Sequence, residues 1–239
     1  MNGFFGELYL RSTRPFLPEE RTQAEVSYLA AQLAPRRAFP VLDAGCGHGR
    51  HAAGLAGCGF RVVGLELDAL SLAERERGAY QLVRGDFLNA PFRRAFGAAF
   101  SWYSTLFVGS DADNLRALHS LAGCLQAGGL LILQTTPFEW LVRHPRAVYR
   151  GTLPDGSHLE EDSVFDAATG TERGARRLRL PDGRELTGTY LTRHYPWDRL
   201  SGLVAEAGFK PLWVHADLER APLAPGSKEL IAGFERAGE

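Results

Sequence analysis

Lysine is almost missing from this chain of 239 residues, since Lys210 and Lys228 are the only two and arginine supplies nearly all of the positive charge. Lysine and arginine together number 27 against 28 acidic residues, so the formal net charge is −1. Proteins that grip a long phosphate backbone usually carry a basic excess, because each neutralised phosphate releases counterions. The charge balance therefore argues against a nucleic-acid partner, although five arginines lie between Arg173 and Arg184.

Cysteine and long apolar runs are scarce as well. Cys46, Cys58 and Cys124 are far apart, and their spacing argues against a disulfide framework and against a zinc site. No apolar run approaches the roughly 20 residues that span a bilayer, and the first residues lack the basic segment of a signal peptide. We expect a cytoplasmic protein without a membrane segment or a metal ion, present as a monomer or a homodimer.

Short apolar strands alternate with helices over much of the chain, after an amphipathic helix at residues 18–34. Strands are expected at 40–44, 61–66, 80–86, 98–103 and 130–134, and helices at 51–58, 69–77 and 114–126. A later helix at 197–207 and strands at 211–215 and 229–234 continue the pattern. This alternation predicts an α/β fold with a parallel sheet that is buried on both faces.

The pattern changes between residues 143 and 197. Strand-like runs at 159–165, 171–180 and 185–195 are joined by turn segments at 166–170 and 181–184. We interpret the whole chain, 1–239, as one domain in which 143–197 is an inserted antiparallel β segment that caps the substrate side.

The run VLDAGCGHGR at residues 41–50 is the most informative motif. A strand leads into glycines 45, 47 and 49 and a helix opens directly after them, so a ligand can approach the backbone and meet the free N–H groups of the helix start. The dinucleotide-binding fingerprint requires a glycine where Arg50 stands, and the loop lacks the Lys-Ser/Thr pair of a phosphate-binding P-loop.

Three acidic residues follow the strands at suitable distances. Asp43 ends the first strand, Glu66 ends the second and lies 23 residues further on, and Asp86 follows the third beside Phe87. A carboxylate at Glu66 suits the hydroxyl groups of a ribose. Acids at three strand ends suit a ligand with an ammonium, a sulfonium and a ribose but no phosphate, which indicates S-adenosylmethionine.

These residues resemble the class I S-adenosylmethionine-dependent methyltransferases, and the nearest likeness is to their bacterial small-molecule branch. The resemblance extends to Gly49-Arg50-His51, to the turns 125–129 and 207–209, and to Arg193-His194-Tyr195. It implies a Rossmann-like three-layer sandwich, with a seven-stranded, mainly parallel sheet whose last strand is antiparallel and an antiparallel β insertion after strand five. Ser101 and Ala127 depart from the usual Asp and Pro of the family.

The resemblance also implies a set of cofactor-binding residues: Asp43, Gly45, Cys46, Gly47, His51, Glu66, Leu67, Asp86, Phe87 and Trp102. Within this set, Cys46 is expected to fill the loop rather than to react. His51 either touches the carboxylate of the cofactor or packs under the loop. Phe4, Phe5 and Tyr9 near the start form either a flap over the cofactor or an apolar latch.

On the acceptor side the candidates are Tyr103, Arg193 and Tyr195. Arg193 and Tyr195 point to one face of their strand, and an arginine fork beside phenols suits a small anionic or polar-aromatic acceptor. The alternative is that Arg193 pairs with an acid on the insertion, Glu160 or Glu161. If the acceptor must lose a proton, Tyr103, Tyr195 or His194 is a possible base.

The sequence thus predicts methyl transfer from S-adenosyl-L-methionine to an unidentified small molecule, which attacks the methyl group in line. A non-catalytic cofactor-binding or regulatory domain is one alternative, and it would have a closed substrate pocket. An RNA methyltransferase is another, and it would have a continuous basic surface beside the pocket.

Overall fold

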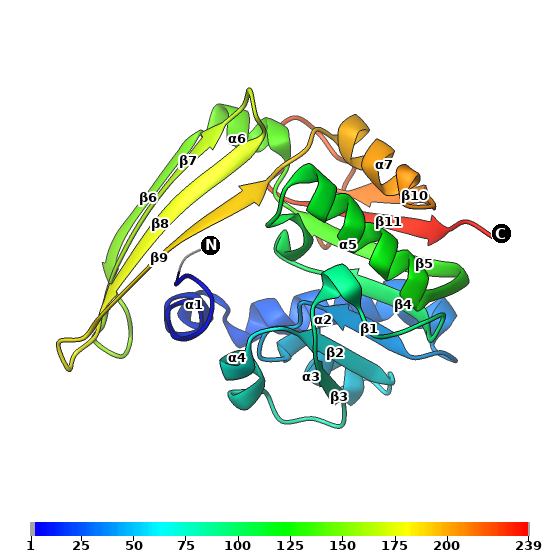
Figure 1. Cartoon of the computed structure of the whole chain (residues 1–239), viewed down its shortest axis with the longest axis horizontal. Helices are drawn as coiled ribbons and strands as arrows, with labels where there is room; N and C mark the ends of the chain where they lie inside the picture. The colour runs from blue at the N-terminus through cyan, green and yellow to red at the C-terminus, as the bar shows by residue number, and fades with distance from the viewer. Residues whose placement is uncertain (1–2, 239) are drawn as a thin grey trace.

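A seven-stranded sheet runs through the structure, a computed structural model that describes residues 3–238 (Figure 1). Its strands lie in the order β10-β11-β5-β4-β1-β2-β3. They span β1 Val41–Ala44, β2 Val62–Glu66, β3 Gln81–Arg84, β4 Phe96–Ser101, β5 Leu125–Thr135, β10 Phe209–His215 and β11 Leu230–Arg236. Strands β1 to β5 pair in parallel, whereas β11 is antiparallel to both of its neighbours. The expected sheet with an antiparallel last strand is confirmed.

Helices cover both faces of this sheet, as the apolar pattern requires. Helices α2 (Glu19–Leu33) and α3 (Arg50–Gly57) pack on one face, where Leu29 and Leu55 are fully buried. Helices α5 (Asp111–Cys124) and α7 (Trp197–Glu206) pack on the other through Leu121 and Leu200 (Figure 1). All residues of β1 and β4 are buried, which is why their sequences read as continuous apolar runs.

The segment after β5 forms a second, antiparallel sheet, here named the cap sheet. Its strands lie in sequence order and span β6 Arg146–Thr152, β7 His158–Asp166, β8 Thr171–Arg179 and β9 Glu185–Arg193. The three expected strands and both turns are present, and β6 is an addition. Six of the seven residues of β6 are exposed, so its sequence lacks the alternation of apolar residues that would have marked it as a strand.

Two short helices were not expected. Helix α1 (Glu7–Thr13) lies between the cap sheet and the main sheet, and α6 (Phe138–Arg143) precedes β6 (Figure 1). Phe4 and Leu8 share a small core with Leu159 and Leu178 of the cap sheet. The backbones of the two segments touch there, since a Cβ added to Gly188 would lie 2.7 Å from Gly3. The N-terminal segment is thereby fastened to the cap sheet.

Two boundaries differ from expectation for identifiable reasons. Helix α4 spans only Ala69–Ala73, because the N–H of Glu76 bonds to the carbonyl of His48 instead of continuing a helix. Strand β5 begins before Gly128 and Gly129. The two glycines lie in a bulge of β5, where the register with β4 shifts between Phe96 and Ala98. Short 3-10 turns occupy Arg14–Phe16, Ala34–Arg36, Phe87–Asn89 and Thr105–Phe107. Within residues 3–238, no helix has the length and apolar character of a membrane span.

Candidate functional site

A cavity of about 610 Å³ opens at the carboxyl ends of β1, β2 and β3. Its lining includes six of the ten residues expected to bind the cofactor, namely Gly45, Gly47, Glu66, Leu67, Asp86 and Phe87. Parallel strands bring their carboxyl ends to one edge of a sheet, which is why residues from three separate strand ends meet here. The remaining lining comes from the N-terminal segment with α1, from the start of α4, from the end of β3 and the turn after it, from the segment after β4 and from α5.

The glycine loop passes close to its neighbours at one position and is open at another. Gly45 and Gly47 have φ angles of +75° and +56°, in the left-handed region that favours glycine. A Cβ on Gly45 would lie 2.3 Å from Cγ2 of Thr105, whereas a Cβ on Gly47 would meet no protein atom within 4 Å. Gly45 is therefore required by packing against the segment after β4, and Gly47 leaves room for a ligand.

Glu66 and Asp86 are held by backbone donors at the edge of the cavity. The two carboxylate oxygens of Glu66 accept hydrogen bonds from the N–H groups of Gly47 and Asp68, both at 2.8 Å. Oδ1 of Asp86 accepts from the N–H of Leu88 at 2.8 Å. Each carboxylate oxygen can accept a further bond, so Glu66 stabilises the glycine loop and can still accept ribose hydroxyls.

Asp43 lies at the end of β1 behind the glycine loop. It is only 2% exposed, and its Oδ2 has no hydrogen-bond partner. Burial raises the pKa of Asp43 to about 8, and the charge of Glu66 adds to this, whereas Arg50 acts in the opposite direction. A buried acid with an unpartnered oxygen fits a cationic group such as the ammonium of S-adenosylmethionine.

This raised pKa predicts that cofactor binding depends on pH. Without cofactor, the folded protein keeps Asp43 protonated up to about pH 8, whereas the ordinary pKa of 3.8 applies in the unfolded chain. The contribution of Asp43 to the free energy of unfolding therefore falls as the pH rises from 3.8 to about 8. A cationic partner favours the ionised form, so affinity should rise between pH 6 and 7.5, by at most about tenfold per unit, with release of a proton. Titration calorimetry in two buffers of different ionisation enthalpy measures that release.

The matched control for this prediction is Asp43→Asn, which has no proton to release. Its affinity should be weak and its binding should release no proton between pH 6 and 7.5. A wild-type affinity that is flat across this range, without proton release, would show that Asp43 does not respond to the cofactor.

Four of the expected cofactor residues do not line the cavity: Asp43, described above, and Cys46, Trp102 and His51. Cys46 packs against Gly64 of β2, and burial raises the pKa of its thiol, which agrees with a loop-filling role. Trp102 is 4% exposed and packs against Tyr28 and His51 in the core. His51 is buried, and its Nε2 lies 2.9 Å from Glu25, so of its two interpretations the structure has the histidine packed under the loop.

The three acceptor-side candidates lie in two separate networks. Arg193 Nη2 lies 2.7 Å from Oδ1 of Asp111, and the hydroxyl of Tyr195 donates to the same oxygen at 2.8 Å. The hydroxyl of Tyr103 donates instead to Glu25 at 2.8 Å. Burial and the charge of Glu25 raise the pKa of Tyr103 to about 12, which makes it a poor base near neutral pH. None of the three belongs to the lining of the cavity.

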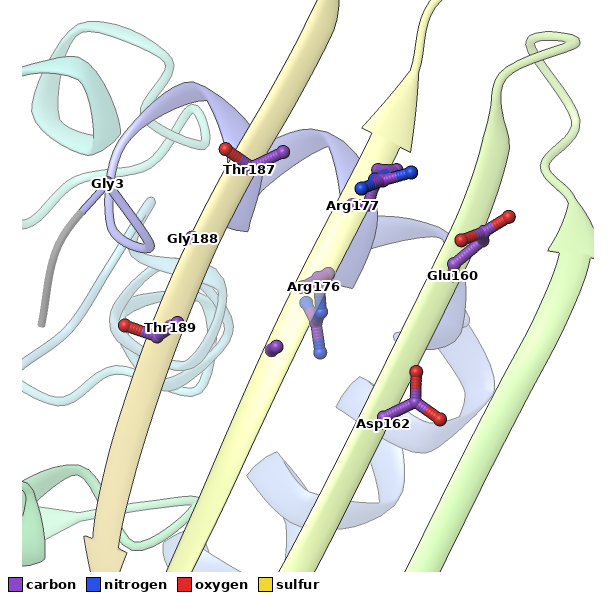
Figure 2. A pocket seen from close by; sticks show the side chains of 9 residues that line it. Gly3, Glu160, Asp162, Arg176, Arg177, Thr187, Gly188 and Thr189 are labelled. Atoms are coloured by element: carbon purple, nitrogen blue, oxygen red, sulfur yellow. The ribbon is translucent and has the colours of Figure 1, made fainter.

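The expected partners of Arg193 were wrong. Glu161 pairs with Arg176 at 2.7 Å, and Glu160 lies on the other face of the cap sheet (Figure 2). Asp111 at the start of α5 takes their place, because the last residue of β9 reaches that helix. His194 is also engaged, with Nε2 3.2 Å from Glu172 and Nδ1 3.3 Å from the carbonyl of Thr136.

Replacing Arg193 tests whether this network is structural. Arg193→Met should lower the melting temperature by roughly 2–6 °C, because charge-assisted hydrogen bonds to Asp111 are worth about 1–2 kcal/mol when partly buried. Affinity for the cofactor should stay within about twofold, since Arg193 is outside the cavity. Thermal melting and calorimetry measure the two quantities, and Arg199→Met is the control because Arg199 is more exposed and lies 3.5 Å from Asp111. A loss of affinity without a change in melting temperature would contradict this structural role.

The N-terminal segment contacts both the cap sheet and the first cavity. Phe4 is buried against the cap sheet, whereas Phe5 and Tyr9 line the cavity. The sequence interpretation missed Thr105 and Asn114, which also line it, and the buried Glu25. Glu25 did leave a signal, because it stands four residues before Leu29 on the apolar face of α2.

A second cavity, of about 650 Å³, lies on the cap sheet away from the glycine loop (Figure 2). Figure 2 shows Glu160, Asp162, Arg177, Thr187 and Thr189 along neighbouring strands of the sheet. Its walls carry charges of both signs, and it shares no lining residue with the first cavity. None of the residues expected to bind the cofactor lines this second cavity.

The comparisons with known proteins agree with this geometry. Residues 41–129 match the sequence model of a protein family described as a methyltransferase domain. No curated protein matches the sequence.

Several solved structures share the fold. One is an S-adenosylmethionine-dependent methyltransferase from Clostridium acetobutylicum, with a TM-score of 0.84 and 12% identity over 96% of this chain and 99% of that chain. A second is the sugar N-methyltransferase KedS8 from Streptoalloteichus, with a TM-score of 0.76 and 20% identity over 98% and 94%. A third is CalS10, an amino pentose methyltransferase from Micromonospora echinaspora, with a TM-score of 0.68 and 20% identity over 99% and 100%.

Proposed function

We propose that this chain, a class I S-adenosylmethionine-dependent methyltransferase, methylates an amine nitrogen on a small polar molecule. The observation that carries the proposal is the charge of the cavity. Four acidic side chains line it, Glu66, Asp68, Asp86 and Asp113, against one basic side chain, Arg84. A cavity of this sign attracts a cationic acceptor and disfavours an anionic one.

Asp113 is the acidic residue best placed to serve the acceptor. It lies at the start of α5 and not at a strand end, where Glu66 and Asp86, which are assigned to the cofactor, lie. Hydrogen bonds from the side chain and backbone of Ser110 hold the pKa of Asp113 below its usual range, so it is ionised at neutral pH. Two solved structures of the same fold, KedS8 and CalS10, are named for methylating a sugar nitrogen and an amino pentose, which supports an amino sugar as acceptor.

The residues present fit the cofactor. Asp43 would face its ammonium group, Glu66 its ribose, and Asp86 and Phe87 its adenine, while Gly47 leaves room for its close approach. When bound, S-adenosylmethionine supplies a methyl group that is already activated by the sulfonium. The protein then needs mainly to hold the acceptor in line and to exclude water, and Phe5 and Tyr9 cover the cavity for this purpose.

The lining also bears on protonation of the acceptor. An amine must lose its proton before its lone pair can react. The residues that line the cavity include neither histidine nor lysine, and the carboxyl of Asp113 is too weak a base to remove that proton efficiently. We therefore infer that the neutral amine is the reacting form, so kcat/KM should rise with pH until the amine of the acceptor is fully deprotonated.

Methyl transfer to a matched panel of acceptors tests the proposal. Amino sugars should accept labelled methyl groups from the cofactor, whereas the same sugars with a hydroxyl or an acetamido group in place of the amine should not. Mass spectrometry identifies the methylated atom. Transfer to hydroxyl or carboxylate oxygens, with all amines inert, would contradict it.

The cap sheet is proposed to act on the acceptor side only. Replacing residues 181–184 with a two-residue Asn-Gly turn should leave cofactor affinity within about twofold, because the contact from this turn to α1, Arg184 to Glu7 at 3.3 Å, is exposed. Turnover should change instead. Calorimetry and turnover assays compare this variant with Arg184→Ala, which loses the contact but keeps the turn. Lost cofactor affinity in the folded, shortened variant would show that this division is wrong.

Neither alternative finds support in the geometry. A continuous basic surface would favour RNA, but the charged residues that line the cavity are four acids and one arginine, and the cavity on the cap sheet mixes Arg177 with Glu160 and Asp162. A non-catalytic domain would have a closed substrate pocket, whereas the cavity extends beyond the cofactor residues to Val108 and Asn114.

A further inference from the structure

The backbone directly after β4 adopts an unusual conformation. Tyr103 and Ser104 have φ angles of +55° and +58°, so two successive residues other than glycine occupy the left-handed region. Such a conformation is costly and persists only where the surroundings hold it. We name these two residues the β4 elbow. It turns the chain so that Thr105 reaches Gly45 of the cofactor loop, at the close approach described above.

Strand β5 holds the elbow from one side. The side-chain Oε1 of Gln134 accepts a hydrogen bond from the N–H of Tyr103 at 2.6 Å, and its carbonyl accepts from the N–H of Ser104 at 3.0 Å. The hydroxyls of Ser104 and Thr135 lie 2.7 Å apart. These bonds fix the elbow to the sheet but do not connect it to the cofactor loop.

Glu25 of α2 makes that connection. Its carboxylate is fully buried, and its Oε1 accepts from the hydroxyl of Tyr103 at 2.8 Å. Its Oε2 lies 2.6 Å from Nη2 of Arg50 and 2.9 Å from Nε2 of His51, in the first turn of α3 directly after the glycine loop. Arg21 Nε donates to Oε1 at 2.8 Å. One carboxylate thus joins α2, the end of the cofactor loop and the β4 elbow.

The charges of Glu25 and its neighbours stay the same near neutral pH. Burial acts to raise the pKa of Glu25, but the bond from His51 and the charge of Arg50 outweigh it and hold this pKa well below the usual range. Burial lowers the pKa of His51 to about 4, so the imidazole is neutral at pH 7. Glu25 is therefore a fixed anion, and Arg50 and Arg21 are the cations that balance it.

We propose that Glu25 is a positioning residue for cofactor binding. It fixes the position of the β4 elbow relative to the start of α3, so that the glycine loop between them keeps its shape. Glu25 does not line the cavity, and neither do the side chains to which it bonds. It acts through Tyr103 and Thr105 on one side of Gly45 and through Arg50 and His51 on the other. The inference concerns the cofactor alone and is independent of the acceptor.

Calorimetric titration with S-adenosylhomocysteine, without any acceptor, tests this role at a temperature well below the melting point of each variant. Glu25→Gln keeps the shape of the side chain but removes its charge, and it should weaken binding about tenfold or more, since it disturbs several charge-assisted bonds. Tyr103→Phe removes only the bond to the elbow and should weaken binding about threefold. Tyr103→Phe also keeps the test usable if Glu25→Gln does not fold.

Glu229→Gln is the matched control. Glu229 also pairs with Arg21 and is partly buried, but it contacts neither the elbow nor α3. The affinity of the Glu229→Gln variant for S-adenosylhomocysteine should therefore stay within about twofold of the wild type. In the double variant with Glu25→Gln, Tyr103→Phe should have little further effect, because Glu25→Gln already disturbs the one bond that Tyr103→Phe removes. Unchanged affinity in the folded Glu25→Gln and Tyr103→Phe variants, with lowered melting temperatures, would overturn the proposal and leave Glu25 a stability residue. Independent, additive effects of the two substitutions would overturn it as well.

Discussion

Glu66→Ala is expected to weaken the binding of S-adenosylmethionine by roughly ten- to a hundredfold, since charge-assisted hydrogen bonds are worth on the order of 1.5–3 kcal/mol and each 1.4 kcal/mol is a factor of ten. The variant loses two things at once. It removes the acceptor for the ribose hydroxyls, and it releases the N–H groups of Gly47 and Asp68 that Glu66 now holds at 2.8 Å. Calorimetric titration with the cofactor or its demethylated product measures the effect.

Two further variants separate these contributions. Glu66→Gln keeps one good acceptor oxygen and should fall between the wild type and Glu66→Ala. Glu74→Ala removes an exposed acid just after α4 that does not line the cavity, and it should bind the cofactor like the wild type. Wild-type affinity in a folded Glu66→Ala protein would refute the assignment of Glu66 to the cofactor.

Gly45→Ala is expected to lower the free energy of unfolding by roughly 2–4 kcal/mol in the absence of cofactor. About 1 kcal/mol comes from placing an L side chain at a φ of +75°. Another 1–3 kcal/mol comes from overpacking, because the new Cβ would lie 2.3 Å from Cγ2 of Thr105. Urea unfolding without cofactor measures this loss directly and avoids any direct effect on the ligand.

The structure offers both a control and a rescue for this substitution. Gly47→Ala has the same kind of left-handed backbone, with a φ of +56°, but no protein atom within 4 Å of the added Cβ, so it should cost only about 1 kcal/mol. Adding Thr105→Ser to Gly45→Ala removes the colliding methyl group and keeps the hydroxyl that donates to the carbonyl of Trp102. The double variant should recover most of the overpacking loss. Equal losses for Gly45→Ala and Gly47→Ala would show that the contact between the loop and Thr105 is unimportant.

The cavity changes the expected nature of the acceptor. The sequence suggested an arginine fork at Arg193 and therefore an anionic acceptor, but that guanidinium is held by Asp111 and by the hydroxyl of Thr171. The charge near the glycine loop comes instead from acids that belong to strand ends and to the start of α5. These acids are the reason that we propose a cationic acceptor and not an anionic one.

The sequence by itself determined the α/β fold and the strand ends that meet at the first cavity, because both are recorded in short contiguous segments. A buried strand followed by three glycines and a helix start can be recognised locally, and so can Glu66 and Asp86 at the ends of the next two strands. Parallel pairing then brings these ends together without further information.

Only the tertiary structure decided which polar groups pair with one another. Tyr103 and Glu25 are 78 residues apart in the chain, and Arg193 and Asp111 are 82 apart, so no spacing within a segment predicts either pair. Strand β6 escaped prediction because it buries almost nothing, and α1 because its partner is the distant cap sheet. Local patterns report which face of an element is buried, whereas the partner of a buried charge depends on how the elements pack. It is this packing that brings Glu25 of α2 to Arg50 and His51, directly after the glycine loop.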